Sequence, residues 1–315
     1  MCAAQRAARS RATYKTSSQQ IFVAPDLTMA SGRYGDLGQF SPTIFSKLSP
    51  NLFFDKYISL DPPVRPSLRA PEAFRESSIN SSQPLPNALG SAVVRFGDSI
   101  AVCGISGSLV DLSDIPDRKF LYTNVECHRG DRSNSVAPED AAVSEWIYQN
   151  ANGAKLFDPA QLLVADGKAV ILVAQIQVLS RSAPPAGIAW AALMAALRVT
   201  KIPVARPPTE DFVPVIKFSA TESTPLALAF DGQLPWCAEL GVATNGLVIA
   251  DPEGEIEEVS VDGRVAVILT QAPDGPLYNV TLTARSATIT QATIDRCIAL
   301  ARARAAELDA LVAGL

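Results

Sequence analysis

Histidine is nearly absent from this sequence, since His128 is the single one among 315 residues. The five cysteines are scattered, and no two of them form a Cys-x-x-Cys pair. Because zinc and iron–sulfur sites need several such ligands at short spacing, we expect no metal and no cofactor. An odd, scattered set of cysteines is typical of a reducing compartment, where most of them are small core residues.

Long apolar runs and a general positive charge are also missing. No run approaches the roughly 20 apolar residues that a membrane helix needs, so we expect no membrane partner. The net charge of -5 is uneven: residues 1–75 contain 10 Lys+Arg and 5 Asp+Glu, whereas the rest contains 17 and 27. An acidic body is a poor general binder of polyanions, so we expect any contact with nucleic acid to be local.

Residues 1–40 have little that predicts a fold. Four basic residues precede the first acid, Asp26, which is also the composition of a mitochondrial transit peptide. Positions 2–13 lack the large apolar residues that an amphipathic face requires. We therefore favour a disordered or extended N-terminal tail over residues 1–40.

The strongest pattern lies in the middle of the chain. Residues 168–179 are almost wholly apolar and rich in β-branched side chains, which predicts a strand buried on both faces. Residues 188–197 are strong helix formers and apolar nearly all round, which predicts a deeply buried helix. The turn between them is a natural place for chemistry, yet it has no acid and no histidine.

The segments before this centre predict further elements. Ser-Pro pairs at 41–42 and 49–50 predict two helix starts, and residues 61–88, rich in proline and serine, predict an irregular wrap. Residues 89–112 predict a hairpin that turns at Gly97-Asp98, and residues 120–127 predict another strand. Pro138 begins a predicted helix that runs to Tyr148.

The segments after the centre repeat the pattern of strands followed by a helix. We interpret the proline-rich residues 201–214 as the join between a first half, 41–205, and a second half, 206–315. Strands are expected near 247–250, 261–270 and 277–283, and then a long helix with Thr288 and Gln291 as a capping box. The fold class is α/β (α+β), with two related βα layers stacked together.

Two constellations have a functional and a structural interpretation. Residues 85–92 invite comparison with the phosphate loop of small-molecule kinases, but one glycine and a following hairpin favour an ordinary strand entry. Cys127 and His128 could form a nucleophile pair, but neighbours at a strand end normally point apart, which favours a loop histidine.

Charged residues give two more candidates. The acidic run Asp251, Glu253, Glu255, Glu257 and Glu258 could hold Mg²⁺, although a solvated surface is the favoured interpretation. Arg129 and Arg132 lie on a glycine-containing loop and could contact phosphate. Solvated surface charge is an equally good explanation for these two arginines.

Five segments, in order, resemble the RNase PH-like subunits of the eukaryotic RNA exosome core. The match covers about residues 41–312, and each motif alone is only moderately specific. Within the family, the first hairpin and residues 190–203 look closest to one subunit of the non-phosphorolytic lineage. The segments are GSAVVRFGDSIAVCGISG, VECHRGDRSNSVAPEDAAVSEWI, AWAALMAALRVTKIP, GLVIADPEGEIEE and the terminal helix.

The resemblance implies an RNase PH-like fold of two βαβ units of the ribosomal-protein-S5-domain-2 type. It implies a place in a hetero-hexameric ring of RNase PH-like subunits, below cap proteins with S1 and KH domains. RNA threaded through that ring would reach a separate catalytic exonuclease. The implied location is the nucleus and nucleolus, and also the cytoplasm. Arg129 and Arg132 would be the RNA contacts on the pore side.

Active members of this family carry an Asp-Gly/Ala-Gly-(Thr/Ser)-Arg turn after the central strand, where the arginine and the turn amides hold inorganic phosphate. The corresponding positions here are Ser182, Ala183, Pro184, Pro185 and Ala186. Two prolines remove two amide donors, and no arginine remains within this turn. We therefore expect a subunit without catalytic residues. The alternatives are a phosphorolytic 3′–5′ exoribonuclease, a small-molecule kinase of the galactokinase–homoserine kinase type, and an independent RNA-binding module.

Overall fold

The computed structural model divides the chain into two compact units, Met1–Leu48 and Ser49–Leu315, which we describe separately. The first unit contains a two-stranded antiparallel sheet of β1 (Thr13–Lys15) and β2 (Ile21–Val23), and the helix α1 (Pro42–Leu48). The structure describes residues 13–15, 21–23, 41–81, 85, 87–115, 119–128, 138–164, 167–206, 217–230, 233–285 and 289–313.

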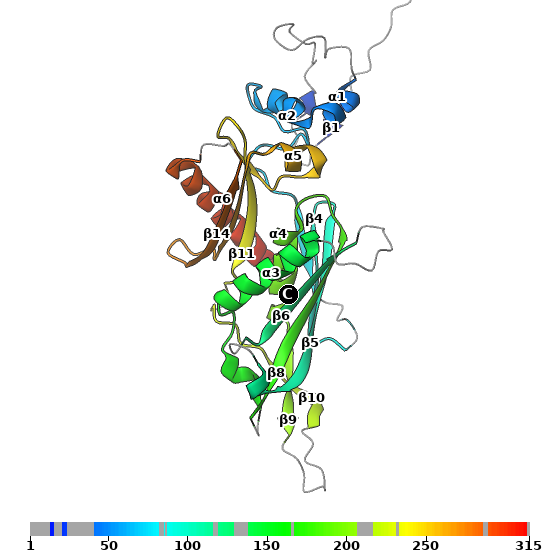
Figure 1. Cartoon of the computed structure of the whole chain (residues 1–315), viewed down its shortest axis with the longest axis vertical. Coiled ribbons are helices and arrows are strands. Elements are labelled where there is room, and N and C mark those ends of the chain that lie inside the picture. The colour runs from blue at the N-terminus through cyan, green and yellow to red at the C-terminus, as the bar shows by residue number, and fades with distance from the viewer. Residues whose placement is uncertain are drawn as a thin grey trace, which may run out of the picture. The chain divides into compact units, whose positions relative to one another are not determined.

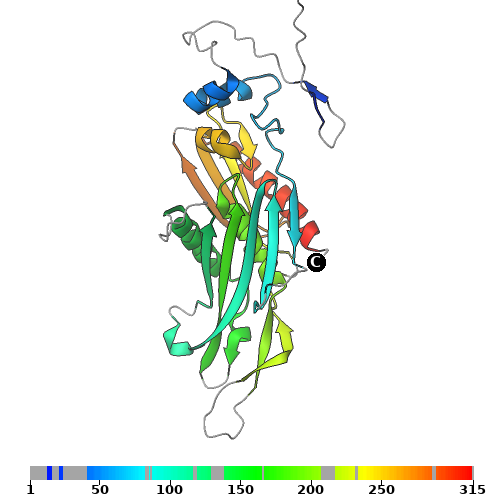
Figure 2. The same ribbon diagram turned by 90° about the vertical axis from the view of Figure 1, so that its right-hand side faces the viewer.

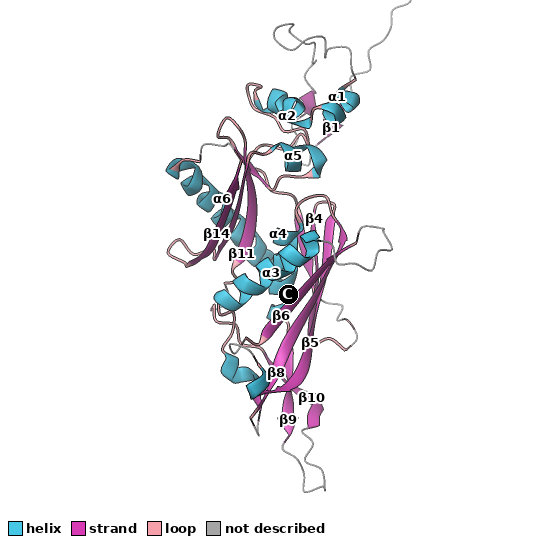
Figure 3. Cartoon of the chain, viewed as in Figure 1, coloured by secondary structure: helices cyan, strands magenta, loops and turns pink. Residues whose placement is uncertain are grey.

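In its described residues the second unit has a larger six-stranded sheet, a smaller four-stranded sheet and a two-stranded sheet. The first two are seen in Figures 1 and 3. The larger sheet has the order β3-β4-β5-β8-β6, and β7 also pairs with β8. Its strands are β3 (Ser77–Asn80), β4 (Gly90–Phe96), β5 (Ser99–Asp111), β6 (Leu121–Cys127), β7 (Leu163–Val164) and β8 (Lys168–Ser180).

The predicted hairpin and crossover of the larger sheet are confirmed. β4 and β5 are antiparallel and turn at Gly97, whose φ of 56° is a conformation that glycine adopts without strain. β6 runs parallel to β8, and the chain crosses between them through the helix α3 (Pro138–Gly153). This is the helix-connected arrangement that parallel strands require.

The central strand β8 is buried on one face only, so the prediction of burial on both faces was wrong. Burial alternates along it: Leu172, Ala174 and Ile176 are fully buried, whereas Gln175 and Gln177 are exposed. The cause is the architecture, because helices pack on one side of this sheet. Figure 2 shows the other side facing the viewer, with no helix of the described residues over it.

The predicted central helix is confirmed as α4 (Pro185–Arg198), and every residue from Gly187 to Leu197 is buried. α4 packs against β4, β5 and β8 on one side and against β11 of the smaller sheet on the other. Its burial on all sides explains why the sequence is apolar nearly all round. Trp190 in α4 donates its indole N–H to the carbonyl of Pro235 at 2.7 Å.

The smaller sheet is wholly antiparallel in the described residues and has the order β12-β11-β13-β14. The long helix α6 (Gln291–Val312) packs on β11 and β13, and the short helix α5 (Gly254–Ser260) packs against α2 (Pro50–Ile58). The strands are β11 (Trp236–Val242), β12 (Val248–Ala250), β13 (Gly263–Leu269) and β14 (Leu277–Ala284).

The free edge of β6 is closed by side chains of α3. The Ser144 hydroxyl accepts from the amide of Val125 at 2.8 Å, and the Asn152 amide donates to the carbonyl of Leu121 at 3.1 Å. An exposed edge strand is a template for pairing with other chains, and this edge is instead satisfied within the chain. α3 is thereby held firmly to the larger sheet.

Three predictions outside the centre need correction. Residues 61–88 are not wholly irregular, because β3 pairs there with β4. Residues 201–214 do not act only as a join, since β9 (Lys201–Arg206) pairs with β10 (Lys217–Pro225), a hairpin whose strands were hidden by the prolines. α6 begins at Gln291 with Thr290 as its N-cap, whereas Thr288 lies outside the described residues.

No helix in the described part of the chain combines the length and the apolar character that a membrane span needs.

Candidate functional site: the turn after the central strand

The turn between β8 and α4 offers few amide donors. Pro184 is the N-cap of α4 and Pro185 is its first residue, and proline has no amide hydrogen. The amide of Ser182 is already used, because it donates to the hydroxyl of Ser99 in β5 at 3.0 Å. The Ser182 carbonyl accepts from the amide of Gly254 at 2.6 Å, which joins the turn to α5.

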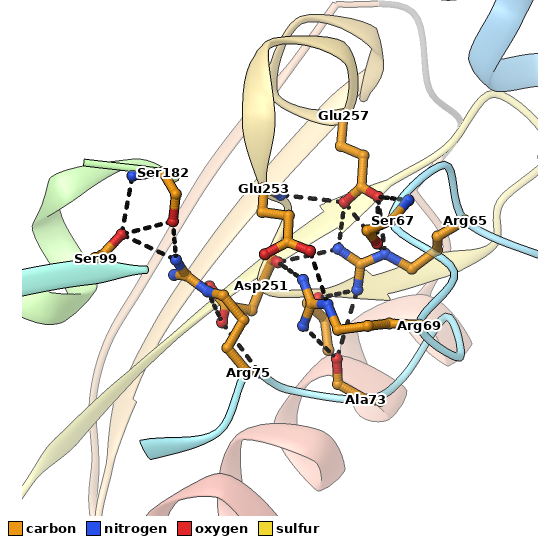
Figure 4. Close-up of polar contacts among 11 residues, drawn as sticks. Arg65, Ser67, Arg69, Ala73, Arg75, Ser99, Ser182, Asp251, Glu253 and Glu257 are labelled. Atoms are coloured by element: carbon orange, nitrogen blue, oxygen red, sulfur yellow. Dashed lines mark hydrogen bonds and ion pairs between the residues drawn. The ribbon is translucent and has the colours of Figure 1, made fainter. Parts of the chain in front are cut away.

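A distant arginine, Arg75, binds the side chain of Ser182 in the turn (Figure 4). Its Nη1 donates to the hydroxyl of Ser182 at 2.9 Å and to that of Ser99 at 3.0 Å. Its Nε and Nη2 donate to the two carboxylate oxygens of Asp251, at 2.6 Å each. This two-pronged pairing is the strong geometry between a guanidinium and a carboxylate. The donors next to the turn therefore serve a carboxylate of the same chain.

Arg65 and Arg69 lie in the same segment as Arg75, residues 61–75, which we call the strap. Both arginines bind carboxylates of the acidic run. The Nε of Arg65 donates to both carboxylate oxygens of Glu257 at 3.2 Å, and Arg69 pairs with Glu253 at 3.0 Å. Both arginines also donate to the carbonyl of Asp251, at 3.1 and 2.9 Å. Figure 4 shows these residues as one connected network.

The favoured prediction of a solvated acidic surface was therefore wrong for two of the five carboxylates, Asp251 and Glu257. Glu257 is 1% exposed and Asp251 is 6% exposed, and Glu253 is bonded to Arg69. The reason is that the strap brings three positive charges against three negative ones, which compensates their burial. Glu253, Glu255 and Glu258 keep exposed or half-exposed side chains.

The network also changes proton affinities. Burial alone would raise the pKa of Asp251, but the hydrogen bonds and charge of Arg75 outweigh it and lower that pKa. Glu239 in β11 behaves in the opposite way. Burial, and then the negative charge of Asp251, raise the pKa of Glu239 to about 8. The positive charge of Arg75 and the hydrogen bond from the amide of Gly187 oppose this shift. The site thus holds one ionised and one largely protonated carboxyl group near neutral pH.

A cavity of about 390 Å³ lies beside the turn. Its walls are Pro184, Pro185 and Ala186 on one side, α3 on a second side, and β13 and β14 on a third. Trp146 of α3 lines it and donates its indole N–H to the hydroxyl of Thr281 at 3.3 Å. The cavity is mostly apolar, and its charged lining residues are three carboxylates and Arg264, which donates to the carbonyl of Glu258 at 2.5 Å.

Of the predicted site residues, the structure describes the five of the turn but not the two proposed RNA contacts. Ser182 faces Ser99 and Arg75, and Ala183 is buried. Arg129 and Arg132 lie outside the described residues, so their role stays a prediction.

Sequence reasoning missed the arginines of the strap, together with Ser99 and Glu239. One signal was present in the sequence: residues 1–75 have a positive net charge, whereas the rest of the chain has a negative net charge. That asymmetry can be satisfied by internal pairing as well as by a partner.

The two alternative constellations have structural roles. Gly90 begins the strand β4, and a Cβ there would lie 2.4 Å from Thr200 Oγ1 and 2.8 Å from the carbonyl oxygen of Ala196. The glycine is thus needed for close packing on α4, and no helix begins at this point to cradle a phosphate. Cys127 is buried, whereas His128 is exposed, so the two side chains point apart.

A protein-family model, curated proteins and solved structures all match this chain. Residues 73–203 match the model of the 3′ exoribonuclease family, domain 1, of the RNase PH type. This part of the chain therefore forms a domain of the RNase PH type. The predicted resemblance and the predicted RNase PH-like α+β fold are therefore both confirmed.

The curated relatives of this chain include two exosome proteins. It is 29% identical over 230 residues to the exosome complex component rrp43 of Schizosaccharomyces pombe, covering 71% of this chain and 82% of that protein. It is 28% identical over 208 residues to the exosome complex component Rrp42 of Pyrobaculum aerophilum, covering 64% and 73%. The first hairpin resembles that of one subunit of the non-phosphorolytic lineage, ribosomal RNA-processing protein forty-three. The first of these two relatives, rrp43, is a protein of that name.

Solved structures share the fold of this chain at low sequence identity. One described as an archaeal exosome core has a TM-score of 0.64 at 20% identity, covering 85% of this chain and 98% of the other. One described as the Archaeoglobus fulgidus exosome with RNA bound to the active site has a TM-score of 0.66 at 18% identity, covering 84% and 98%. Rice Rrp46 gives 0.56 at 14% identity, covering 79% and 97%.

Proposed function

We propose that this chain is a non-catalytic subunit of the RNase PH-like ring of an RNA exosome, and that it supports 3′–5′ RNA processing and degradation. One observation carries the proposal: the donors beside the turn are engaged with Asp251, Ser99 and Ser182 of the same chain. An attacking phosphate needs free donors placed in advance, and removing even one such donor costs several kcal/mol in comparable sites.

The partners follow from the relatives, which are named as exosome components. Our proposal places the chain between two other RNase PH-like subunits, in contact with a cap protein that carries S1 or KH domains. RNA passes through the ring to a separate catalytic exonuclease. The chain then acts in the nucleus, the nucleolus and the cytoplasm, where rRNA maturation and mRNA turnover take place.

Assembly is the direct test. The full chain is expressed together with the other ring subunits of its own source and analysed by size exclusion with mass measurement. We expect a stoichiometric complex, and the same complex without this chain should fail to close into a ring. Elution of the chain as a separate monomer beside an intact ring would contradict the proposal.

The alternative is an active phosphorolytic exoribonuclease, in which Asp251, an aspartate of the second half of the chain, would assist the attack of phosphate on the RNA linkage. The assay follows release of nucleoside diphosphates from RNA in phosphate buffer, for the chain alone and within the ring. We expect no release above background, and no difference between the natural chain and Asp251→Asn. Phosphate-dependent release that Asp251→Asn abolishes would establish the enzyme instead. A kinase would transfer phosphate from ATP to a small molecule, and the strand at Gly90–Phe96 gives it no phosphate loop.

The predicted RNA contacts need the assembled ring. Arg129→Ala with Arg132→Ala should weaken RNA binding by the ring about equally for different sequences, because phosphate contacts carry no sequence information. Each lost contact should reduce the salt dependence of binding by about 0.7 for single-stranded RNA. An unchanged salt dependence would show that these arginines do not face the RNA.

A further inference from the structure

A second cavity, of about 780 Å³, lies at the C-terminal end of α3 and shares no lining residue with the cavity beside the turn. Its wall is mostly apolar and includes the core residues Phe120 and Phe157, which are at most 8% exposed. The segment after α3 is fixed, because the amide of Ala229 donates to the carbonyl of Leu156 at 3.0 Å and Phe157 forms a β-bridge with Leu228. The cavity is therefore formed in advance and has the size of a small-ligand site.

Two lysines supply positive charge at this cavity. Lys119 and Lys155 both line it, and neither ammonium group has an ion pair or a side-chain hydrogen bond with a residue that the structure describes. Asp158 is the carboxylate of the described lining, and it accepts from the amide of Ala160 at 3.0 Å. In a chain with a net charge of -5, this excess of positive charge favours an anion.

The backbone of Lys155 has a conformation that glycine normally takes at this position. Its φ is 48°, and it is the second residue after Gly153, the last residue of α3. Helices commonly end in glycine here, because a side chain is unfavourable in the left-handed region. A lysine is thus held where glycine would be more stable, and residues strained in this way cluster at functional sites.

Two aromatic rings adjoin the cavity through Lys119. The Nζ of Lys119 lies 5.2 Å from the ring centroid of Tyr148 in α3, and that ring lies 5.8 Å from the ring of Tyr122 in β6. Both tyrosines are half-buried, so each keeps some exposed surface. Positive charges that hold phosphates, next to aromatic rings on which bases stack, are the combination with which proteins bind single-stranded nucleic acid.

We propose that Lys119, Tyr122, Tyr148 and Lys155, which we call the lysine–tyrosine corner, bind a short segment of single-stranded RNA together with the adjoining cavity. The two lysines contact phosphate groups, one base lies against the apolar wall of the cavity, and the next base stacks on Tyr122. The choice of RNA rests on the proposed function. The binding itself is tested on the chain alone, so a failure to bind and a failure to assemble into a ring are distinguished.

Fluorescence anisotropy of a labelled RNA of about ten nucleotides, a length that such sites span, measures the binding. The full chain is titrated at about 0.05 M NaCl, where screening is weak, and then at higher salt. We expect saturable binding that weakens as the salt concentration rises.

Lys155→Gly is the decisive variant, because it removes the charge and also relieves the backbone. It should weaken RNA binding about fivefold, and it should reduce the slope of log affinity against log salt by about 0.7. The same variant should unfold at a higher temperature than the natural chain. Weaker binding by a more stable chain cannot be caused by unfolding.

Three further variants separate the parts of the corner. Tyr122→Leu keeps an apolar side chain without a stacking ring, so it should weaken binding about tenfold and leave the salt slope unchanged. Asp158→Asn should strengthen binding, because it removes the negative charge and asparagine caps a helix as well as aspartate. The matched control is Arg296→Met, which removes an exposed positive charge outside the cavity lining and should change the affinity little.

Unlabelled AMP and inorganic phosphate are the competitors. AMP should displace the RNA at lower concentration, since its base can use the apolar wall, and equal displacement by both would overturn the proposal. No RNA binding at low salt, or equal losses of affinity in Lys155→Gly and Arg296→Met, would also overturn it.

Discussion

At the scale of single residues, Leu68 has an unfavourable backbone conformation. Its φ is 62°, which costs an L-residue about 1–2 kcal/mol, and its side chain is 40% exposed. Leu68→Gly should therefore stabilise the chain by about 1 kcal/mol, as measured by urea unfolding. Leu179→Gly is the control, because Leu179 is similarly exposed but lies in the strand β8, where glycine should destabilise. A loss of stability in Leu68→Gly would show that the leucine side chain contributes more than its strain costs.

Glu239 should make stability fall as pH rises. Its pKa of about 8 in the folded chain lies above the ordinary value of about 4.3, so the folded state holds more protons between these values. Under linkage, the free energy of unfolding must then decrease from about pH 4.3 to about pH 8. Glu239→Gln should remove this decrease and stabilise the chain at pH 8 by roughly 1–3 kcal/mol. Urea unfolding at pH 6 and pH 8 checks it, and an unchanged pH dependence would contradict it.

Single residues were the least predictable level from sequence. The identities at 182–186 pointed to a turn without phosphate donors, because proline and alanine have fixed chemistry wherever they lie. That Ser182 would meet Arg75, 107 positions earlier, could not be read from local pattern. Long-range charge pairs have no periodicity, so only the overall charge asymmetry hinted at them.

At the scale of elements, the pair of Arg75 and Asp251 should be essential to the turn. Arg75→Met leaves a buried carboxylate without its partner, which typically costs about 3–5 kcal/mol. The double variant Arg75→Met with Asp251→Asn should regain part of that loss, because no uncompensated charge remains. Urea unfolding of both, with the exposed-pair variant Arg296→Met expected to cost less than about 1 kcal/mol, gives the comparison. Equal losses in the single and double variants would show that charge compensation is not the cause.

Element types were largely predictable, whereas burial was predictable only in part. The strong helix formers of residues 188–197, apolar nearly all round, predicted both the helix α4 and its burial. The same logic failed for β8, since Ile171 and Val173 are apolar but face the uncovered side of the sheet. The prolines at 203 and 225 concealed β9 and β10, which pair only with each other in the described residues. Proline is tolerated in such two-stranded edges.

At the scale of the whole second unit, the strap stabilises the last part of the chain through its ion pairs with residues 251–257. Arg65, Arg69 and Arg75 pair with residues 251–257, and α2 packs on α5. A fragment of residues 234–315 should therefore stay unfolded alone and gain structure when residues 49–75 are fused to it or added. Circular dichroism and amide exchange measure this. A fragment that folds without the added segment would show that the strap is dispensable.

The pairing of Arg75 with Asp251 can form only late in the synthesis of the chain. These residues are 176 positions apart, so at about 5–20 residues per second roughly 10–35 s separate their emergence from the ribosome. During that interval the three strap arginines of the nascent polypeptide lack the carboxylates with which they pair in the folded chain. The strap can therefore take its final contacts only after about four-fifths of the chain has been translated, and until then cellular chaperones can shield it.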